Sequence, residues 1–483
     1  MDKQTVKNIL KLLSIIGMYL SIFFIIPILV GMYYHEDIAL FALFDGFFFF
    51  FNFLIYLIFK NHSIILSLRD GILSVNLIWI LVGFAGAIPL WLYSNITLMQ
   101  GIFESISGFT TTGATIYGDI EILPHSILIL RSLMHWIGGM GILVLGVGLL
   151  SLINPSGSLA LFKAESTGIK LDKSTPKIKD TAMMLWGIYI ILTFLNTLFL
   201  LWGGMGLFDA INHAFSTIST GGFSTKNSSL GAFDGTFVLW TTTFFMVISG
   251  ITFLAHLKAF TGYFGGYKNE ETIWYLIVFC LLSLVLTFVR YSGSDDSFYM
   301  ALTHASFTIA SLMTTTGFAS LDYETWGQLA IAICFIAMVA SGNGGSTAGG
   351  IKIIRYIVAT KVILSEFKKI LHPNAIIKVF INGVAVSPSL VSMTFAFILM
   401  FILTNTIVTF YLYGSGYDMT TAFFASIACV GNIGPGFGMV GPSHTFAFFN
   451  DVDLFVLSLA MIVGRLEIFT FLLIFLPSFW KRF

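Results

Sequence analysis

Long apolar segments alternate with short polar ones along almost the whole chain. Ten segments are apolar over the roughly 20 residues that a helix needs to cross a bilayer. They are residues 9–32, 39–59, 72–95, 124–152, 182–205, 236–257, 271–290, 326–351, 389–413 and 452–478. The first is longer than the apolar region of a signal peptide and no small-residue cleavage site follows it, so we interpret it as a retained helix. The pattern predicts an all-α polytopic membrane protein with ten transmembrane helices.

Composition supports this fold class. The 483 residues are 57% hydrophobic and 10% charged, whereas soluble domains carry about 25% charged residues. The formal net charge of zero gives no signal for a nucleic-acid partner. The three cysteines have neither metal-site nor disulfide spacing. We find no motif of an enzyme, and we expect no bound cofactor.

Basic residues predict the orientation. If the N-terminus is inside, the cytoplasmic segments are the two termini and residues 60–71, 153–181, 258–270 and 352–388. These segments and their edges hold 20 of the 24 Lys and Arg, the asymmetry that the positive-inside rule describes. We therefore expect both termini to be cytoplasmic.

Four shorter segments between the spans resemble one another. Each combines helical potential with small or hydroxyl residues and ends at a glycine, which is Gly113, Gly222, Gly317 or Gly434. Two full spans flank each segment, so the four units enter the membrane in the same orientation and can surround one axis as parallel repeats. The predicted domains are two extra N-terminal helices (1–66) and four pore repeats, 67–155, 156–262, 263–375 and 376–483.

The four segments suit a cation filter. Non-helical backbone at membrane depth must be buried in protein or line a wet cavity, and rings of backbone carbonyls can replace the hydration shell of an ion. Glycine permits positive φ and puts no Cβ into a narrow passage. Four ordinary outer loops are the alternative, but their common register favours a re-entrant filter. Its predicted residues are Thr111, Thr112, Gly113, Thr220, Gly221, Gly222, Thr315, Thr316, Gly317, Asn432, Ile433 and Gly434.

A glycine-rich segment, residues 341–350, interrupts the eighth span. Each glycine costs a helix about 1 kcal/mol against alanine, so a continuous helix is not expected there. A phosphate-binding loop would need a Gly-Lys-Ser/Thr ending and a preceding strand, and both are missing. A kink for close packing stays open, but we favour a flexible gate below the filter. Its predicted residues are Gly342, Gly344, Gly345, Ser346, Thr347, Gly349 and Gly350.

Charged residues inside predicted spans are functional candidates. Our hypothesis is that Arg465 faces the pore below the filter, repels a resting cation and contacts the 341–350 segment. The alternative is a charge neutralised by carbonyls of the broken helix purely for packing. Glu104 could attract cations at the outer mouth or accept hydrogen bonds from a loop backbone. We interpret His135 as a packing residue and do not assume that Glu467 is the partner of Arg465.

These motifs resemble the Trk/Ktr/HKT superfamily of cation transporters over essentially the whole chain. The resemblance rests on Thr110-Thr-Thr-Gly113, Ser219-Thr-Gly-Gly222-Phe-Ser, Thr314-Thr-Thr-Gly317-Phe, Gly431-Asn-Ile-Gly434-Pro-Gly, the run from Gly342 to Lys352, and Gly464-Arg-Leu-Glu-Ile-Phe469. The ten-span layout is most similar to the bacterial TrkH potassium-uptake branch.

The resemblance implies potassium uptake across the bacterial inner membrane through a pore that an intramembrane loop obstructs. In the superfamily a serine in place of the first filter glycine accompanies sodium preference, so Gly113 implies potassium as the transported ion. The implied partners are a second copy, membrane lipids and a cytosolic TrkA-like nucleotide- and NAD-binding ring. The fourth loop, with Asn432 and Ile433, departs from the common pattern and implies looser selectivity. A proton- or sodium-coupled potassium symporter is the alternative.

Overall fold

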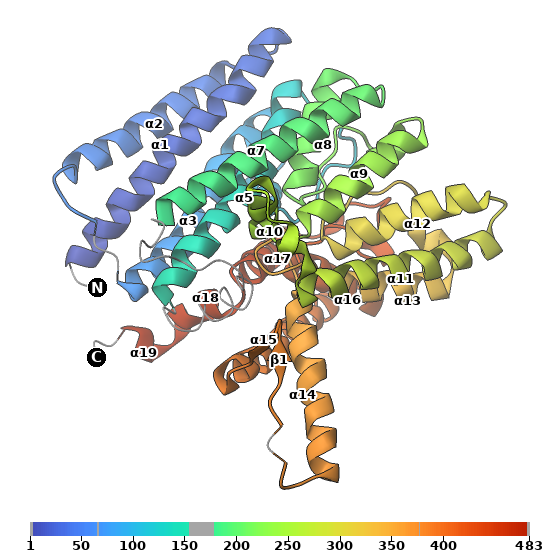
Figure 1. The fold of residues 1–483 in the computed structure, drawn as a ribbon. Helices are drawn as coiled ribbons and strands as arrows, with labels where there is room; N and C mark the ends of the chain where they lie inside the picture. Colours follow the sequence, from blue (N-terminus) through green and yellow to red (C-terminus); the bar gives the residue numbers. More distant parts are fainter. Residues whose placement is uncertain (1–2, 65–66, 154–177, 376, 481–483) are drawn as a thin grey trace.

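The computed structural model describes residues 3–64, 67–153, 178–375 and 377–480 of the chain (Figure 1). The predicted boundary between the first two repeats, at 155/156, and most of the predicted cytoplasmic segment 153–181 lie outside the described residues. The side chains of residues 142–153 are likewise outside the description.

Two long helices form the N-terminal pair. Helices α1 (Lys3–Tyr33) and α2 (Ala39–Ile58) lie side by side along one edge of the molecule (Figure 1). In the loop between them, the Glu36 carboxylate accepts hydrogen bonds from the backbone N–H groups of His125 (2.5 Å) and Ser126 (3.0 Å). The pair is therefore tied to the first helical turn of α5.

Four units follow, and each contains a long helix, a short helix, and a final helix or broken pair. The first unit contains α3 (Leu68–Tyr93), α4 (Leu98–Phe109) and α5 (His125–Ile153), and the second contains α7 (Ile178–Trp202), α8 (Leu207–Ile218), α9 (Thr236–Ser249) and α10 (Phe253–Phe260). The third unit contains α11 (Glu270–Gly293), α12 (Phe298–Met313), α13 (Gln328–Val339) and α14 (Ile353–Leu371). The fourth unit contains α15 (Pro388–Gly414), α16 (Met419–Val430), α17 (Asp451–Arg465) and α18 (Phe469–Leu472).

Short elements connect these helices. They are the 3₁₀ turns η1 (Ser229–Ala232), η2 (Phe264–Lys268), η3 (Tyr323–Trp326), η4 (Gly438–Val440), η5 (Phe446–Phe448) and η6 (Leu473–Phe475), the strands β1 (Phe380–Ile381) and β2 (Val384–Ala385), and helix α19 (Pro477–Trp480). The two strands pair antiparallel, with Phe380 opposite Ala385. The hairpin lies beside α14 (Figure 1), and its turn residue Asn382 exchanges hydrogen bonds with Glu270 at the start of α11.

Polar caps start three of the four short helices. Thr97 forms a capping box with Gln100 at α4, and the side chains of Ser297 and Asp418 accept N-terminal backbone hydrogen bonds at α12 and α16. Such caps satisfy N–H groups that have no partner within the helix. The chain can therefore begin these helices at fixed residues between two long spans.

The spans are less regular than the apolar pattern predicts. Within the described residues, six helices are long and apolar enough to cross a membrane, or eight if each bent pair is counted as one span. The predicted continuous spans 236–257 and 452–478 are wrong in this respect, because α9 and α10 bend by 97° and α17 and α18 by 113°. Apolar composition reports the environment of a segment and carries little information about backbone continuity. The predicted 124–152 span is the single helix α5, while α13 ends at Val339 and α14 begins at Ile353.

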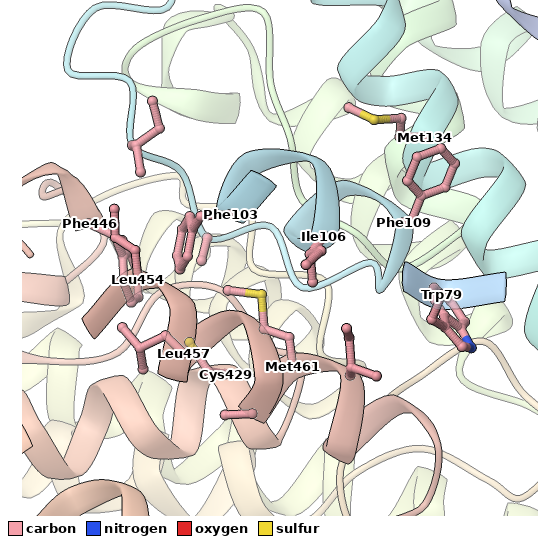
Figure 2. Packing of buried hydrophobic residues seen from close by; sticks show 14 of the residues in the cluster. Trp79, Phe103, Ile106, Phe109, Met134, Cys429, Phe446, Leu454, Leu457 and Met461 are labelled. Atoms are coloured by element: carbon pink, nitrogen blue, oxygen red, sulfur yellow. The ribbon is translucent and has the colours of Figure 1, made fainter. Parts of the chain in front are cut away.

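The largest buried cluster surrounds the first short helix. Phe103, Ile106 and Phe109 of α4 pack among side chains from helices α3, α5, α16 and α17 (Figure 2). The labelled neighbours are Trp79, Met134, Cys429, Phe446, Leu454, Leu457 and Met461. Helix α4 is thus enclosed by protein, whereas α2 exposes large side chains such as Phe47 and Phe50 outwards. The short helices lie inside and the long helices form the apolar exterior.

Candidate ion-permeation site

The four short helices end in the same strained backbone turn. The first residue beyond each helix C-cap has φ between 52° and 57°, and the glycine two residues later has φ between 80° and 97°. The non-glycine residues are Thr111, Thr220, Thr315 and Asn432, and the glycines are Gly113, Gly222, Gly317 and Gly434. Positive φ in a non-glycine residue costs about 1–3 kcal/mol and persists only where the surroundings impose it. Four equivalent outliers indicate a functional constraint.

The hydrogen bonds of the four turns are also equivalent. The N–H between the two positive-φ residues donates to a carbonyl five residues earlier at 2.8–2.9 Å. The donor–acceptor pairs are Thr112–Ser107, Gly221–Ser216, Thr316–Ser311 and Ile433–Ala428. The fourth turn keeps this geometry despite its different sequence, because the pattern requires only backbone groups.

The four turns meet in a closed ring. A Cβ added to each filter glycine would collide with a carbonyl oxygen of the next loop. The glycine–carbonyl pairs are Gly113–Gly221, Gly222–Thr316, Gly317–Ile433 and Gly434–Thr112. The order runs through the four loops and returns to the first. At each contact only glycine leaves room for the neighbouring backbone.

One cavity lies on one side of this ring. Its volume is about 190 Å³, and all four positive-φ glycines line it together with Arg131 and Lys226. The two residues that precede each glycine are buried; Gly113, Gly222 and Gly317 are themselves partly exposed, and Gly434 is buried. The twelve predicted filter residues are thus brought together on one axis, with backbone carbonyls at the narrow ring. No cluster of three His, Cys, Asp or Glu side chains that could hold a metal ion occurs in the part of the chain described.

The interrupted segment lies against the other side of the ring. Its ends are joined by a backbone bridge between Ser341 and Lys352. The N–H of Gly349 donates to the Thr315 hydroxyl at 2.7 Å, and the Thr347 hydroxyl donates to the carbonyl of Ile218 at 3.2 Å. The segment therefore contacts the C-terminal ends of α8 and α12. Of the predicted gate residues, Gly342, Ser346, Thr347 and Gly349 are buried, Gly344 and Gly350 are half-buried, and Gly345 is exposed.

Arg465 is the last residue of α17 and lies beside this segment. Its Nη1 donates to the carbonyl of Thr347 at 2.9 Å, and its side chain is buried. Glu467 lies in the break after α17 and pairs instead with Arg355 of α14, at 2.7 Å. The Nζ of Lys352 contacts the carbonyls of Ala348 and Gly349. Arg465 and Lys352 therefore donate hydrogen bonds to carbonyls of the segment on this side of the ring.

Polar groups of α11 hold the opposite flank of the segment, a feature that the sequence did not indicate. The Glu271 carboxylate accepts a hydrogen bond from the N–H of Gly344 at 2.6 Å, and Asn343 donates to the Thr272 hydroxyl at 2.8 Å. A glutamate at a helix start reads as an ordinary first-turn residue. The partner 73 residues away could not be inferred from it.

The structure distinguishes the two alternatives for Glu104. Its side chain is fully buried and accepts a hydrogen bond from the N–H of Ile116 at 2.9 Å, so it braces the loop from behind and does not face the outer solvent. Its other partners are the Thr115 hydroxyl and Arg131, a residue that the sequence did not single out. His135 stacks on Phe223 with ring centroids 4.0 Å apart, as expected for a packing residue.

Comparisons with known proteins agree with this architecture. The sequence matches the TrkH family model, described as cation transport protein, over residues 39–289 and 271–482. Two similar proteins are Trk system potassium uptake proteins TrkH. That of Halomonas elongata is 34% identical and covers 99% of this chain and 100% of its own length. That of Salmonella typhimurium is 35% identical over 86% of this chain and 87% of its own.

A solved structure is similar over the same length. The crystal structure of the potassium transporter TrkH from Vibrio parahaemolyticus has a TM-score of 0.89 and 32% identity, and the match covers 99% of this chain and 100% of that one. Full-length similarity in both sequence and fold establishes the family. The chain belongs to the TrkH family of cation transport proteins, which are membrane transporters and not enzymes.

Proposed function

We propose that this chain carries potassium into a bacterial cell through a single pore on the axis of the four loops. The observation that carries the proposal is the closed ring of glycine–carbonyl contacts from Gly113 back to Thr112. Such a ring presents carbonyl oxygens around one passage, and carbonyls can replace the water around a dehydrated cation. The negative ends of the four short-helix dipoles also point toward the ring and favour a cation there.

The filter residues in this proposal are the twelve predicted from the sequence. Gly113 leaves the first loop without a side chain, the condition that accompanies potassium preference in the superfamily. The relatives that share the family are named potassium uptake proteins. Within the fourth loop, Asn432 donates to the Thr112 hydroxyl and to the Met461 carbonyl, both at 3.0 Å. Its amide thus braces the ring at a position where the other loops carry threonine.

The 341–350 segment acts as the gate in this proposal, and Arg465 stabilises its closed form. The segment packs under the ring, and its carbonyls are held by Arg465 and Lys352. Moving it aside breaks several hydrogen bonds, so it can act as a two-state element that a partner biases. The guanidinium also places a positive charge next to the path of the ion.

The proposed setting is the inner membrane, with ten crossings, both termini in the cytoplasm and four repeats at the predicted boundaries. The distribution of Lys and Arg supports this orientation. We propose that the chain works within a Trk complex, as a homodimer on a TrkA-like regulatory ring. The names of the relatives, which place them in Trk systems, support the first part of this assignment.

Cation flux in proteoliposomes tests the proposal. Potassium, rubidium, sodium and lithium are compared across an imposed ion gradient, with and without a pH gradient. We expect passive flux that favours potassium and rubidium and does not depend on the pH gradient. Flux that appears only with a proton or sodium gradient contradicts a passive pore and supports the coupled symporter.

Gly113→Ser sharpens the test. The added side chain points at the Gly221 carbonyl, so we expect the potassium-to-sodium flux ratio to fall by about tenfold or more, because a small misplacement of coordinating groups is costly. An unchanged ratio in a folded variant contradicts the filter assignment.

A further inference from the structure

A buried ion pair joins the first short helix to helix α5. Arg131 Nε lies 2.9 Å from Glu104 Oε1, and the side chains are only 1% and 0% exposed. The pair lies directly behind the filter turn of the first loop, because Glu104 also accepts hydrogen bonds from the Thr115 hydroxyl (3.0 Å) and the Ile116 N–H (2.9 Å). Both acceptor oxygens of the carboxylate are thus used.

Arg131 reaches beyond the first loop to the second. Its Nη2 donates to the Thr115 hydroxyl at 3.2 Å, and its Nη1 donates to the carbonyl of Ser224 at 3.3 Å. The guanidinium stacks over the Phe223 ring, 4.0 Å from its centroid. Thr115 and Ser224 each stand two residues after a filter glycine. One planar, five-donor group therefore holds equivalent points of two adjacent loops at a fixed separation.

The other loops have no carboxylate at the position equivalent to Glu104. Nine residues before the filter glycine, where the first loop has Glu104, the others have His213, Thr308 and Ala425. His213 contacts the Ser224 hydroxyl at 2.9 Å. In the third loop the Ser311 hydroxyl donates to the Phe318 carbonyl, and in the fourth the Tyr323 hydroxyl donates to the Gly436 carbonyl. Of the four equivalent positions, only that of the first loop carries a carboxylate, and its arginine partner reaches the second loop.

Burial makes the Glu104–Arg131 pair sensitive to substitution of either residue. Taking two charges out of water is unfavourable unless each is paired and hydrogen-bonded, and removing one partner leaves a buried charge without compensation. Such a pair is a poor general stabiliser but a strong constraint on geometry, since its hydrogen bonds are met in only one arrangement. The Lys226–Glu121 pair links the same two loops at the surface, with side chains 35% and 45% exposed, and lacks that constraint.

We propose that Glu104 and Arg131 are positioning residues that fix the spacing between the first and second filter loops and thereby determine discrimination among alkali cations. The proposal rests on the proposed function, because it assumes that the ring is the filter. Neither side chain needs to touch the ion. Their effect passes through Thr115, Ile116 and Ser224 to the carbonyls of the ring.

Three variants of the full chain in proteoliposomes test this assignment. Glu104→Gln leaves the Arg131 charge without compensation, Arg131→Lys keeps the charge but loses the fork that reaches Ser224, and the double variant Glu104→Gln/Arg131→Gln removes both charges together. The double variant leaves no orphaned charge, so it tests the proposal even if a single variant does not fold. Asp296→Asn is the matched control, because it breaks an arginine pair, Arg290–Asp296, that does not touch the ring.

The readout is the rubidium-to-sodium flux ratio, with thermal stability measured alongside. We expect each of the three variants to lower the ratio by about tenfold, since coordinating groups that shift by less than an ångström lose much of their effect, and Asp296→Asn to leave it unchanged. A double variant that folds and keeps the wild-type ratio overturns the positioning role. If the wild-type chain itself shows no selective passive flux, the proposed function fails instead, and the two failures are thus distinguished.

Discussion

The ring of four turns and the interrupted 341–350 segment that packs against it are built in opposite ways. In the ring, four different sequences adopt one backbone form, with positive φ at Thr111 and its three counterparts and at each glycine. On the side of the ring where the 341–350 segment lies, the four units differ in backbone structure. Helix α5 has no break, α9 and α10 bend by 97°, α17 and α18 bend by 113°, and a loop separates α13 from α14.

This contrast separates two physical demands. A ring of carbonyls around one ion requires the same backbone geometry from each of the four loops. The side chains can differ as long as that geometry is kept. A gate requires one element that can move against the others, so symmetry is broken where it lies. The 341–350 segment touches the second, third and fourth units through Ile218, Thr315 and Arg465. In the proposed function, this single segment closes the passage that the four units form.

Gly222→Ala gives the largest expected effect, because it disturbs the backbone geometry that the four loops of the ring share. The new Cβ would collide with the carbonyl of Thr316, which is backbone and cannot turn away. We expect rubidium flux to fall by about a hundredfold or more, as displaced coordinating groups cost on that scale. Rubidium uptake into proteoliposomes measures it.

Gly204→Ala is the matched control for this prediction. Gly204 has φ of 89°, close to the 85° of Gly222, but nothing lies within 4 Å of an added Cβ. We expect normal flux and a loss of stability of about 1 kcal/mol from backbone strain alone. Equal loss of flux in both variants would show that strain, and not the ring contact, explains the effect.

Arg465→Gln alters the contact that holds the 341–350 segment, the element that makes the four units unequal. Removing the charge and the hydrogen bond to the Thr347 carbonyl loosens the closed segment. We expect passive rubidium flux to rise by about tenfold, within the usual range of coupling between sites, while the potassium-to-sodium ratio stays the same. Arg465→Lys keeps the charge, so its rubidium flux should lie between that of the wild type and that of the glutamine variant. Unchanged flux in the glutamine variant would mean that Arg465 serves packing only.

Arg355→Gln probes the same region through an ion pair that the 341–350 segment does not itself form. It removes the ion pair with Glu467, which joins α14 to the break after α17. Because Glu467 is more than half exposed, the pair is worth under about 1 kcal/mol and the flux should change by about threefold at most. Glu467→Gln should reproduce the effect, and the double variant should add nothing further. Additive effects would indicate that the two residues act separately.

Glu36→Gln gives the smallest effect on transport, because Glu36 lies outside both regions. Burial opposes ionisation of its carboxyl, but hydrogen bonds from Ser126 and His125 outweigh burial and hold its pKa below the usual range. A lowered folded-state pKa contributes stability above the unfolded pKa, and that contribution is lost as the pH falls through the folded one.

We therefore expect the Glu36→Gln variant to keep normal flux and to lose about 1 kcal/mol at neutral pH, the usual contribution of a helix N-terminal acceptor. The difference from wild type should vanish in acid, below the lowered pKa. Thermal unfolding measured across pH 3 to 7 checks this. A difference that persists at the lowest pH would mean that the carboxylate charge is not what stabilises the α1–α2 loop against α5.

Local sequence was enough to predict a large part of the molecule. Apolar length located the long helices, polar caps such as Thr97 and Asp418 mark where short helices start, and the glycines at equal offsets identified the four turns. The run of glycines between Gly342 and Gly350 predicted the interruption of the eighth span. These features are local because hydropathy, capping and glycine freedom act within a few residues of chain.

Tertiary contacts decided the rest. The sequence did not reveal the breaks after Ser249 and Arg465, because an apolar window does not report where a neighbouring loop takes over backbone hydrogen bonds, as Asn343 does at the carbonyl of Gly250. It also did not reveal that Gly434 lies against Thr112, or that Arg131 reaches Ser224. Those contacts join residues far apart in the chain. Their energies arise only when the four units close around one axis, since no periodicity along a single segment encodes which neighbour will lie opposite.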